Sequence, residues 1–213
     1  MKQDVVVVEN HSMSDQFLCY NCQNEHIKGT IFCSKCHFIQ PITVNNYFAL
    51  FNLEERFDLD LSALEQTYLK LQQLLHPDKF ITKTKTEQIL ALKHSSLINN
   101  AYDILKYNLS RSEYLLQLHN IIINQDTNNN IKADIELLEE IMELRNSLDE
   151  AEQQTQIEEM ACSQKRNKIA IIARIRNYFA HENYQQAAIE TIRLRYINKL
   201  IADIELKLSM LKL

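Results

Sequence analysis

The chain has 213 residues, 46% of them hydrophobic and 24% charged, and this balance excludes a wholly disordered protein. It contains only one glycine and two prolines, residues that sheets and tight turns require, so we expect a mostly helical fold of two or three modules. The net charge of -5 argues against nucleic acid as a partner, and no run of about eighteen apolar residues predicts a transmembrane segment.

The N-terminal part of the chain differs in composition from the rest. Residues 1–16 form a predicted tail that is acidic and lacks arginine, unlike a mitochondrial transit peptide. Residues 17–44 hold four of the five cysteines and the single glycine, so we interpret them as a separate small module. Pro41 predicts an extended connector, because proline disfavours helix in the residue before it, and we place a boundary near residue 45.

The four cysteines of this module form two Cys-x2-Cys pairs, Cys19 with Cys22 and Cys33 with Cys36. Each pair can place two thiolates on one metal ion from a tight turn, and four thiolates complete the tetrahedral shell that zinc prefers. Gly29 lies between the pairs, where the chain must reverse. The spacing therefore predicts a structural zinc site.

Other interpretations of the cysteines stay open. Iron bound to four thiolates has the same geometry as zinc, and disulfides would require an oxidising compartment, of which the sequence gives no sign. His26 and His37 are alternative ligands, although surface positions suit them better. Cys162 stands alone and is expected to be a small buried residue.

A helix is predicted where apolar residues recur every three to four positions over residues 61–75. Asp60 or Ser62 can cap its start, and Pro77 stops it by removing a backbone donor. A similar pattern over residues 89–105 predicts a second helix antiparallel to the first, so the two form a hairpin.

The remaining helices are expected after this hairpin. Ser110 is a candidate N-cap for a short helix over residues 111–119, and residues 120–130 form a polar linker. Three helices of a small antiparallel bundle are then expected, at residues 131–161, 165–181 and 184–213. The first is strongly acidic, and by itself this pattern favours a solvated face beside core leucines.

The tripeptide His76-Pro77-Asp78 lies at the turn of the predicted hairpin. With its flanking residues it resembles the J-domain family of co-chaperones, and those residues are Tyr47-Phe48, Leu50, Leu64, Tyr68, Asn100-Ala101-Tyr102 and Leu105. The resemblance implies that the tripeptide binds an ATPase chaperone and triggers ATP hydrolysis, without performing chemistry itself. Proline stiffens the loop and lowers the entropy cost of presenting the Asp78 carboxylate to a cationic partner. The alternative is a plain helix stop with an exposed histidine and aspartate.

The charge of the hairpin departs from the family pattern. J-domains usually carry several basic residues on the helix before the loop, whereas residues 60–75 contain only Lys70. Lys79, Lys83 and Lys85 follow the loop and are expected to compensate. If steering depends on the helix before the loop, the chaperone should associate more slowly than with more basic relatives.

The C-terminal bundle resembles the scaffold-binding domain of HscB-type J-proteins. The likeness is carried by Met142-Glu143-Leu144-Arg145, Leu148-Asp149-Glu150, Leu194-Arg195-Tyr196 and Lys199-Leu200. It implies binding of the iron-sulfur cluster scaffold protein by Leu138, Met142, Glu143, Glu150 and Tyr196. Asn146 stands where relatives often have an acid, so one charged contact is expected to be missing. A cysteine module ahead of the J-domain resembles eukaryotic members of this family.

The resulting prediction is an all-α protein, with a J-domain hairpin and a C-terminal three-helix bundle preceded by a small zinc-knuckle module. The expected parts are a tail, the zinc module, the J-domain, a linker and the scaffold-binding bundle, at residues 1–16, 17–44, 45–119, 120–130 and 131–213. The resemblance implies a non-enzymatic co-chaperone of the mitochondrial matrix that delivers the scaffold protein to a DnaK-type heat-shock chaperone and stimulates its ATPase. No nucleic acid or membrane is expected as a partner.

Three alternatives are kept. The acidic tail leaves the cytosol as a second location. The bundle could serve another client, which would make the protein a general J-protein. The four cysteines could instead bind iron in an electron carrier or act as a thiol oxidoreductase. Other enzyme activity is unsupported, because the chain has no Gly-rich phosphate loop and no evident nucleophile beside a base.

Overall fold

The computed structural model describes residues 16–27, 30–123 and 135–211, and contacts between residues divide the chain into two compact units. The first unit holds the described residues up to 55 together with residues 59–107, and the second holds residues 56–58 and those from 108 onward. Seven α-helices dominate the described part, which confirms the predicted all-α class. None of these helices is long and apolar enough to span a membrane.

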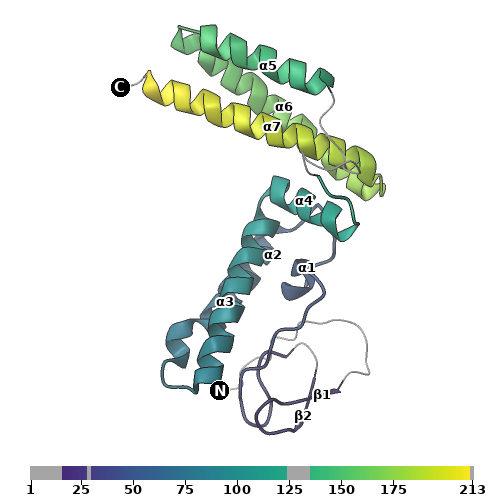
Figure 1. Ribbon diagram of the computed structural model, residues 1–213, viewed down its shortest axis with the longest axis vertical. Helices are drawn as coiled ribbons and strands as arrows, with labels where there is room; N and C mark the ends of the chain where they lie inside the picture. The colour runs from purple at the N-terminus through teal and green to yellow at the C-terminus, as the bar shows by residue number, and fades with distance from the viewer. Residues whose placement is uncertain (1–15, 28–29, 124–134, 212–213) are drawn as a thin grey trace. The chain divides into compact units, whose positions relative to one another are not determined.

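The cysteine module of the first unit consists of turns and very short strands. Strand β1 (Gln16–Leu18) pairs antiparallel with β2 (Glu25–Ile27); both are labelled in Figure 1. Phe32 forms an isolated bridge with Ile39, whose side chain is fully buried. Gly29, the predicted reversal point, lies outside the described residues.

The predicted helical hairpin is confirmed. Helices α2 (Leu61–Leu75) and α3 (Lys85–Lys106) lie side by side and antiparallel, and the short α1 (Tyr47–Leu50) packs against α3 (Figure 1). A short 3-10 helix, η1 (Pro77–Phe80), forms the turn between α2 and α3. The proline therefore ends α2 where the sequence indicated.

Capping and packing explain where the hairpin helices begin and how they are joined. The carboxylate of Asp60 accepts hydrogen bonds from the first turn of α2, and Thr84 and Glu87 form a capping box at the start of α3. The rings of Tyr68 and Tyr102 stack between the helices with centroids 3.9 Å apart. The aliphatic residues at the buried positions of both helices are Leu64, Leu71, Leu75, Ala91, Ile98, Ala101 and Leu105.

The second unit is helical throughout its described elements. It contains α4 (Asn108–Leu118), α5 (Ile135–Glu150), α6 (Gln154–Ala180) and α7 (Tyr184–Met210). Helices α6 and α7 pack along their length, and α4 and α5 each contact α7 (Figure 1). The three-helix bundle is thus confirmed, and α4, expected within the module at 45–119, belongs by its contacts to this unit.

Helix α4 begins earlier than predicted, so Ser110 lies inside the helix and is not its N-cap. The buried guanidinium of Arg111 donates to the carbonyl of Phe57 at 2.8 Å and to the side chain of Asn108 at 2.6 Å. Phe57 in turn stacks on Phe179 with centroids 5.5 Å apart. These contacts join segments far apart in sequence, and they fix the first turn of α4.

The predicted boundary between the first two bundle helices is wrong. The expected helix over residues 131–161 is interrupted at residues 151–153, and no break occurs at 162–164. The ammonium of Lys207 on α7 donates to the terminal carbonyls of α5, at Leu148 and Asp149. Because this cap comes from a distant helix, the local pattern of apolar residues does not reveal it.

Cys162 is exposed on α6, which corrects the expectation of a buried residue. The buried positions of α6 recur every three to four residues, at Ile157, Ala161, Gln164, Ile171 and Ile175. Cys162 follows a buried alanine by one position, and a step of about 100° along a helix turns it toward solvent.

Candidate metal centre and protein-binding surfaces

The structure brings the four predicted cysteine ligands together. Their sulfur atoms all lie within 4.8 Å of one another, with Sγ of Cys19 3.5 Å from that of Cys36 and Sγ of Cys22 3.8 Å from that of Cys33. All four cysteines are free of disulfides. A tetrahedral zinc ion with Zn–S bonds of about 2.3 Å places its sulfur ligands about 3.8 Å apart, so the cluster has the size of a metal shell. The four cysteines can therefore hold a metal ion.

The two Cys-x2-Cys pairs lie in matching backbone turns. In each turn the backbone N–H of the first cysteine donates to the carbonyl of the residue five positions later. The carbonyl of the same cysteine accepts from the N–H of the residue at the fourth position after it, and all four distances lie between 2.9 and 3.0 Å. The residues at that fourth position, Gln23 and His37, have φ of 55° and 57°. His37 is exposed and the cluster found among the described residues contains cysteines only; the side chain of His26 is not described.

The pKa values of the thiols indicate how strongly the sulfurs interact. Burial raises the pKa of Cys19, but hydrogen bonds from the backbone N–H groups of Cys22 and Asn21 and from neighbouring thiols outweigh it and bring the pKa to about 6. The N–H of Asn24 lowers the pKa of Cys22, yet burial and the neighbouring thiols raise it to about 11. Thiolates this close repel one another, so a bound cation would allow all four to lose their protons.

The predicted chaperone-binding tripeptide is displayed at the surface of the first unit. The side chains of His76 and Asp78 are 54% and 79% exposed, and His76 Nδ1 lies 3.5 Å from a carboxylate oxygen of Asp78. The same nitrogen accepts a hydrogen bond from the backbone N–H of Asp78 at 3.3 Å. Pro77 opens η1, and Phe80 at its end is buried, which anchors the loop.

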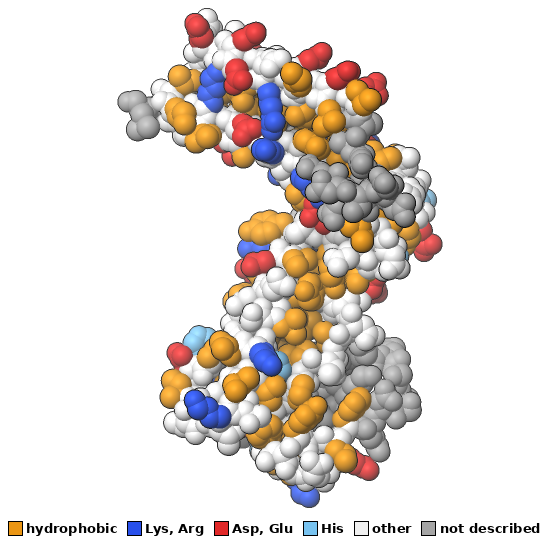
Figure 2. All heavy atoms as spheres, in the orientation of Figure 1, with side chains coloured by type: hydrophobic (Ala, Val, Ile, Leu, Met, Phe, Trp, Pro, Cys, Tyr) orange, Lys and Arg blue, Asp and Glu red, His pale blue; other side chains and the backbone are white. Residues whose placement is uncertain are grey.

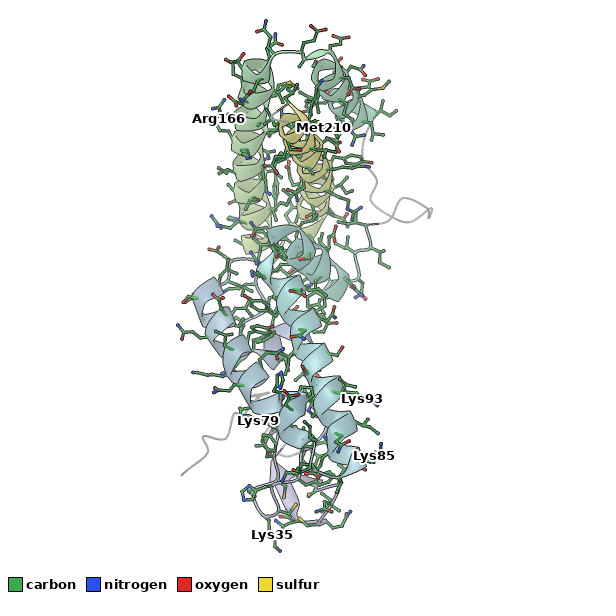
Figure 3. The ribbon with its side chains drawn as sticks, turned by 90° about the vertical axis from the view of Figure 1, so that its left-hand side faces the viewer. Lys35, Lys79, Lys85, Lys93, Arg166 and Met210 are labelled. Atoms are coloured by element: carbon green, nitrogen blue, oxygen red, sulfur yellow. The ribbon has the colours of Figure 1, made fainter. Side chains whose placement is uncertain are left out.

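Basic side chains lie beyond this loop. Figure 3 labels Lys79 in the turn, with Lys85 and Lys93 projecting outward from α3. Ile89 and Leu92 of α3 are 53% and 62% exposed. Lys79 and Lys85 thus follow the tripeptide, as the sequence indicated, and α3 also carries exposed apolar residues.

The predicted scaffold-binding residues of α5 lie on its exposed side. Leu138 and Met142, one helical turn apart, are 43% and 66% exposed, and Glu143 and Glu150 are also exposed. Figure 2 shows hydrophobic and acidic side chains side by side over this helix. The buried stripe of α5 is a different one, formed by Leu137, Ile141 and Leu148.

Tyr196 is half-buried on α7, next to α5. Arg193 donates to Glu140 at 2.8 Å, and Arg145 lies 3.5 Å from Asp203, so α5 and α7 run in the same direction at this contact. Tyr196 falls between these two anchors, at the level of residues 140–145 of α5. The structure therefore places Tyr196 near the level of Met142.

Glu150 lies apart from the other predicted residues, at the opposite end of α5. It lines an open hollow of about 580 Å³ between α5 and α6, together with Ser147, Ala151, Gln156, Glu159, Met160 and Ser163. Eight residues of helix separate it from Met142, which is about 12 Å along the axis. A single partner must therefore extend along the helix to contact both.

His94 ties the cysteine module to the hairpin. It is 4% exposed on α3, and its Nε2 accepts a hydrogen bond from the backbone N–H of Ile42 at 3.2 Å. Its Nδ1 is buried with no hydrogen-bond partner among the described residues. Burial lowers the pKa of His94 from 6.5 to about 4. The imidazole is therefore neutral at pH 7, as its role as an acceptor requires.

We expect His94 to make the protein less stable in mild acid. Between pH 6.5 and 4 the unfolded chain binds a proton at His94 that the folded chain does not bind. The free energy of unfolding therefore falls as the pH falls through this range, and the full contribution of neutral His94 is present above pH 6.5. The loss at pH 5 relative to pH 7 should be about 2 kcal/mol. Urea unfolding of the wild type and of His94→Gln, which keeps an acceptor for Ile42, measures it. The same pH dependence in both proteins would contradict the assignment.

Comparison with known proteins places the chain among co-chaperones. The sequence model of a family described as HSCB C-terminal oligomerisation domain matches residues 133–205. The mouse iron-sulfur cluster co-chaperone protein HscB is 33% identical over 192 residues, which cover 88% of this chain and 81% of the mouse protein.

Solved structures agree with this relationship. The crystal structure of human co-chaperone protein HscB matches with a TM-score of 0.81 and 32% identity, covering 89% of this chain and 97% of the human one. The chaperone HscB from Vibrio cholerae matches with a TM-score of 0.71 and 32% identity, covering 78% of this chain and 99% of the bacterial one.

Proposed function

The chain belongs to the HscB family of iron-sulfur cluster co-chaperones, and we propose that it binds the cluster scaffold protein, delivers it to a DnaK-type heat-shock chaperone and stimulates that chaperone's ATPase to promote cluster transfer. Its tetracysteine cluster fits the eukaryotic form of the family. The observation that carries the proposal is the His76-Pro77-Asp78 loop, exposed at the turn of a helical hairpin.

The geometry of the loop supports contact with the chaperone. Pro77 limits the loop's backbone freedom, and Phe80 is buried beneath it, so little conformational entropy is lost when a partner binds. The exposed carboxylate of Asp78 can accept two hydrogen bonds from one arginine, a strong and directional contact. The lysines after the loop would attract an acidic partner surface over longer distances.

The exposed face of α5 supports contact with the scaffold protein. Leu138 and Met142 offer apolar surface, and Glu143 beside them offers charge, which matches the usual pattern of a hydrophobic interface centre with a polar rim. Arg193 and Arg145 hold α5 against α7, so this face is presented on a fixed helix.

Binding both partners through separate surfaces would make the protein bivalent. A chain that holds the scaffold protein on the bundle and the chaperone at the loop raises the concentration of each near the other to roughly the millimolar range. The protein would thereby assist an ATPase, and we expect it to have no catalytic activity of its own.

Capture of the purified scaffold protein on immobilised protein tests the choice of client. We expect capture by the wild type and equal capture when residues 76–78 are replaced by alanine, because the loop and α5 belong to different compact units. If the immobilised protein captures the chaperone but does not capture the scaffold protein, the proposal is contradicted, and a general J-protein with another client is favoured. Cell fractionation tests the proposed mitochondrial matrix location against the cytosol.

We propose zinc as the ion held by the four cysteines. Purified protein should be colourless and contain one zinc per chain, because Zn²⁺ has a filled d shell and no redox chemistry. Removal with a chelator should release the metal and expose all four cluster thiols to a thiol reagent. A coloured, redox-active metal form would contradict zinc and favour the iron-binding electron carrier. Far-ultraviolet circular dichroism serves as a control, since α2 to α7 should stay helical.

A further inference from the structure

Gln40 is a buried polar residue next to the cysteine cluster. Its side chain is only 1% exposed, although it is not one of the four metal ligands. A buried amide is costly unless its hydrogen-bonding groups are satisfied. The partners of the Gln40 amide lie in both cysteine turns of the module.

The amide of Gln40 connects the two cysteine turns. Its Nε2 donates to Sγ of Cys19 at 3.3 Å and to the backbone carbonyl of Phe38 at 2.9 Å, and its Oε1 accepts from the backbone N–H of Tyr20 at 3.2 Å. The backbone N–H of Gln40 donates to the carbonyl of Ile31 at 2.8 Å. One side chain thus contacts the first turn twice and the second turn once.

These neighbours fix the orientation of the amide. With the oxygen and nitrogen exchanged, the oxygen would face the Phe38 carbonyl and the Cys19 sulfur, while the NH₂ group would face the Tyr20 N–H. Both contacts would be repulsive. The donor is therefore held toward the sulfur, and both amide hydrogens have acceptors.

We propose that Gln40 is a positioning residue of the metal centre, which orients the Cys19 thiolate and stabilises its charge through an N–H to sulfur hydrogen bond. This inference rests on the proposal that the four cysteines hold a metal. Cys19 is fully buried, so no solvent is available to stabilise its thiolate. The donors that do so are the Gln40 amide and backbone N–H groups of its own turn, including that of Asn21 at 3.4 Å.

The expected effect is on the lifetime of the bound metal. Groups that hold metal ligands in place typically contribute 10-fold to 100-fold to metal affinity. We expect Gln40→Met, which keeps length but removes the donor, to transfer zinc to a chromophoric chelator at least about 10-fold faster than the wild type. Gln40→Glu should be faster still, because it keeps the acceptor for Tyr20 but places negative charge beside the thiolate.

Tyr20→Ala is the matched control. The ring of Tyr20 is 72% exposed, and its backbone N–H, which bonds to Gln40, is retained in this variant. Zinc transfer from Tyr20→Ala should equal that of the wild type. Equal rates for Gln40→Met and the wild type would overturn the inference.

Cadmium substitution distinguishes positioning from simple packing. In full-length protein loaded with ¹¹³Cd²⁺, nuclear magnetic resonance should detect scalar coupling between the cadmium and one side-chain amide proton of Gln40, transmitted through the hydrogen bond to sulfur. If cadmium is bound by four thiolates and this coupling is absent, the role of Gln40 is overturned but the metal centre is not. Failure to bind either zinc or cadmium would overturn the metal centre itself.

Discussion

Asp78→Asn is expected to abolish stimulation of the chaperone ATPase while leaving scaffold binding unchanged. The substitution keeps the shape of an exposed side chain but removes the charge that would pair with a cationic partner. Losing one member of such a pair in an interface typically costs 2–5 kcal/mol, or a factor of roughly 30 to several thousand in affinity. Steady-state ATP hydrolysis by the purified chaperone, measured against increasing concentrations of each variant, gives the result.

Glu65→Gln is the control for Asp78→Asn. Glu65 is an exposed acid on α2, in the same unit, and its loss changes the net charge equally. It should stimulate as the wild type does. Full stimulation by Asp78→Asn would contradict the assigned role of the loop, and loss of scaffold binding as well would indicate a misfolded variant.

Replacing Leu138, Met142 and Tyr196 together with alanine is expected to have the opposite effect to Asp78→Asn: scaffold binding is lost and chaperone stimulation is kept. Leu138 and Met142 are exposed and Tyr196 is half-buried, so the triple replacement should leave the fold intact, whereas central apolar contacts of an interface can contribute about 2 kcal/mol or more each. Scaffold affinity should fall more than about 100-fold, while chaperone stimulation without scaffold protein is retained. Isothermal titration calorimetry with the purified scaffold protein measures the change.

Ile169→Ala provides the matching control for the triple variant. Ile169 is an apolar residue on α6 that is 68% exposed, and no binding role is assigned to it. Its replacement should leave scaffold affinity at the wild-type value. Undiminished affinity in the triple variant would show that the scaffold protein binds elsewhere.

The elements that were predicted well are those whose signals are local. The spacing of Leu64, Leu71 and Leu75 is enough to define the buried face of α2, and Pro77 marks its end through its missing backbone donor. The cysteine spacing likewise located the cluster, because two residues between ligands fit one tight turn.

The features that were missed depend on contacts between distant segments. The C-terminal end of α5 is capped by the ammonium of Lys207 from α7. The start of α4 is fixed by the hydrogen bond from Arg111 to the carbonyl of Phe57. Gln40 belongs to no motif, and only the folded module brings it to Cys19, twenty-one positions away. His94 is similar, since nothing in its local pattern indicates the bond from Ile42.

The bivalent role is tested most directly by chaperone ATPase rates with this protein and the scaffold protein added separately and together. We expect the rate with both to exceed the sum of the separate increases, because simultaneous binding raises the effective concentration of scaffold protein at the chaperone. That excess should vanish with Asp78→Asn and with the Leu138, Met142 and Tyr196 triple variant. A rate that is only additive for the wild type would contradict the proposed function.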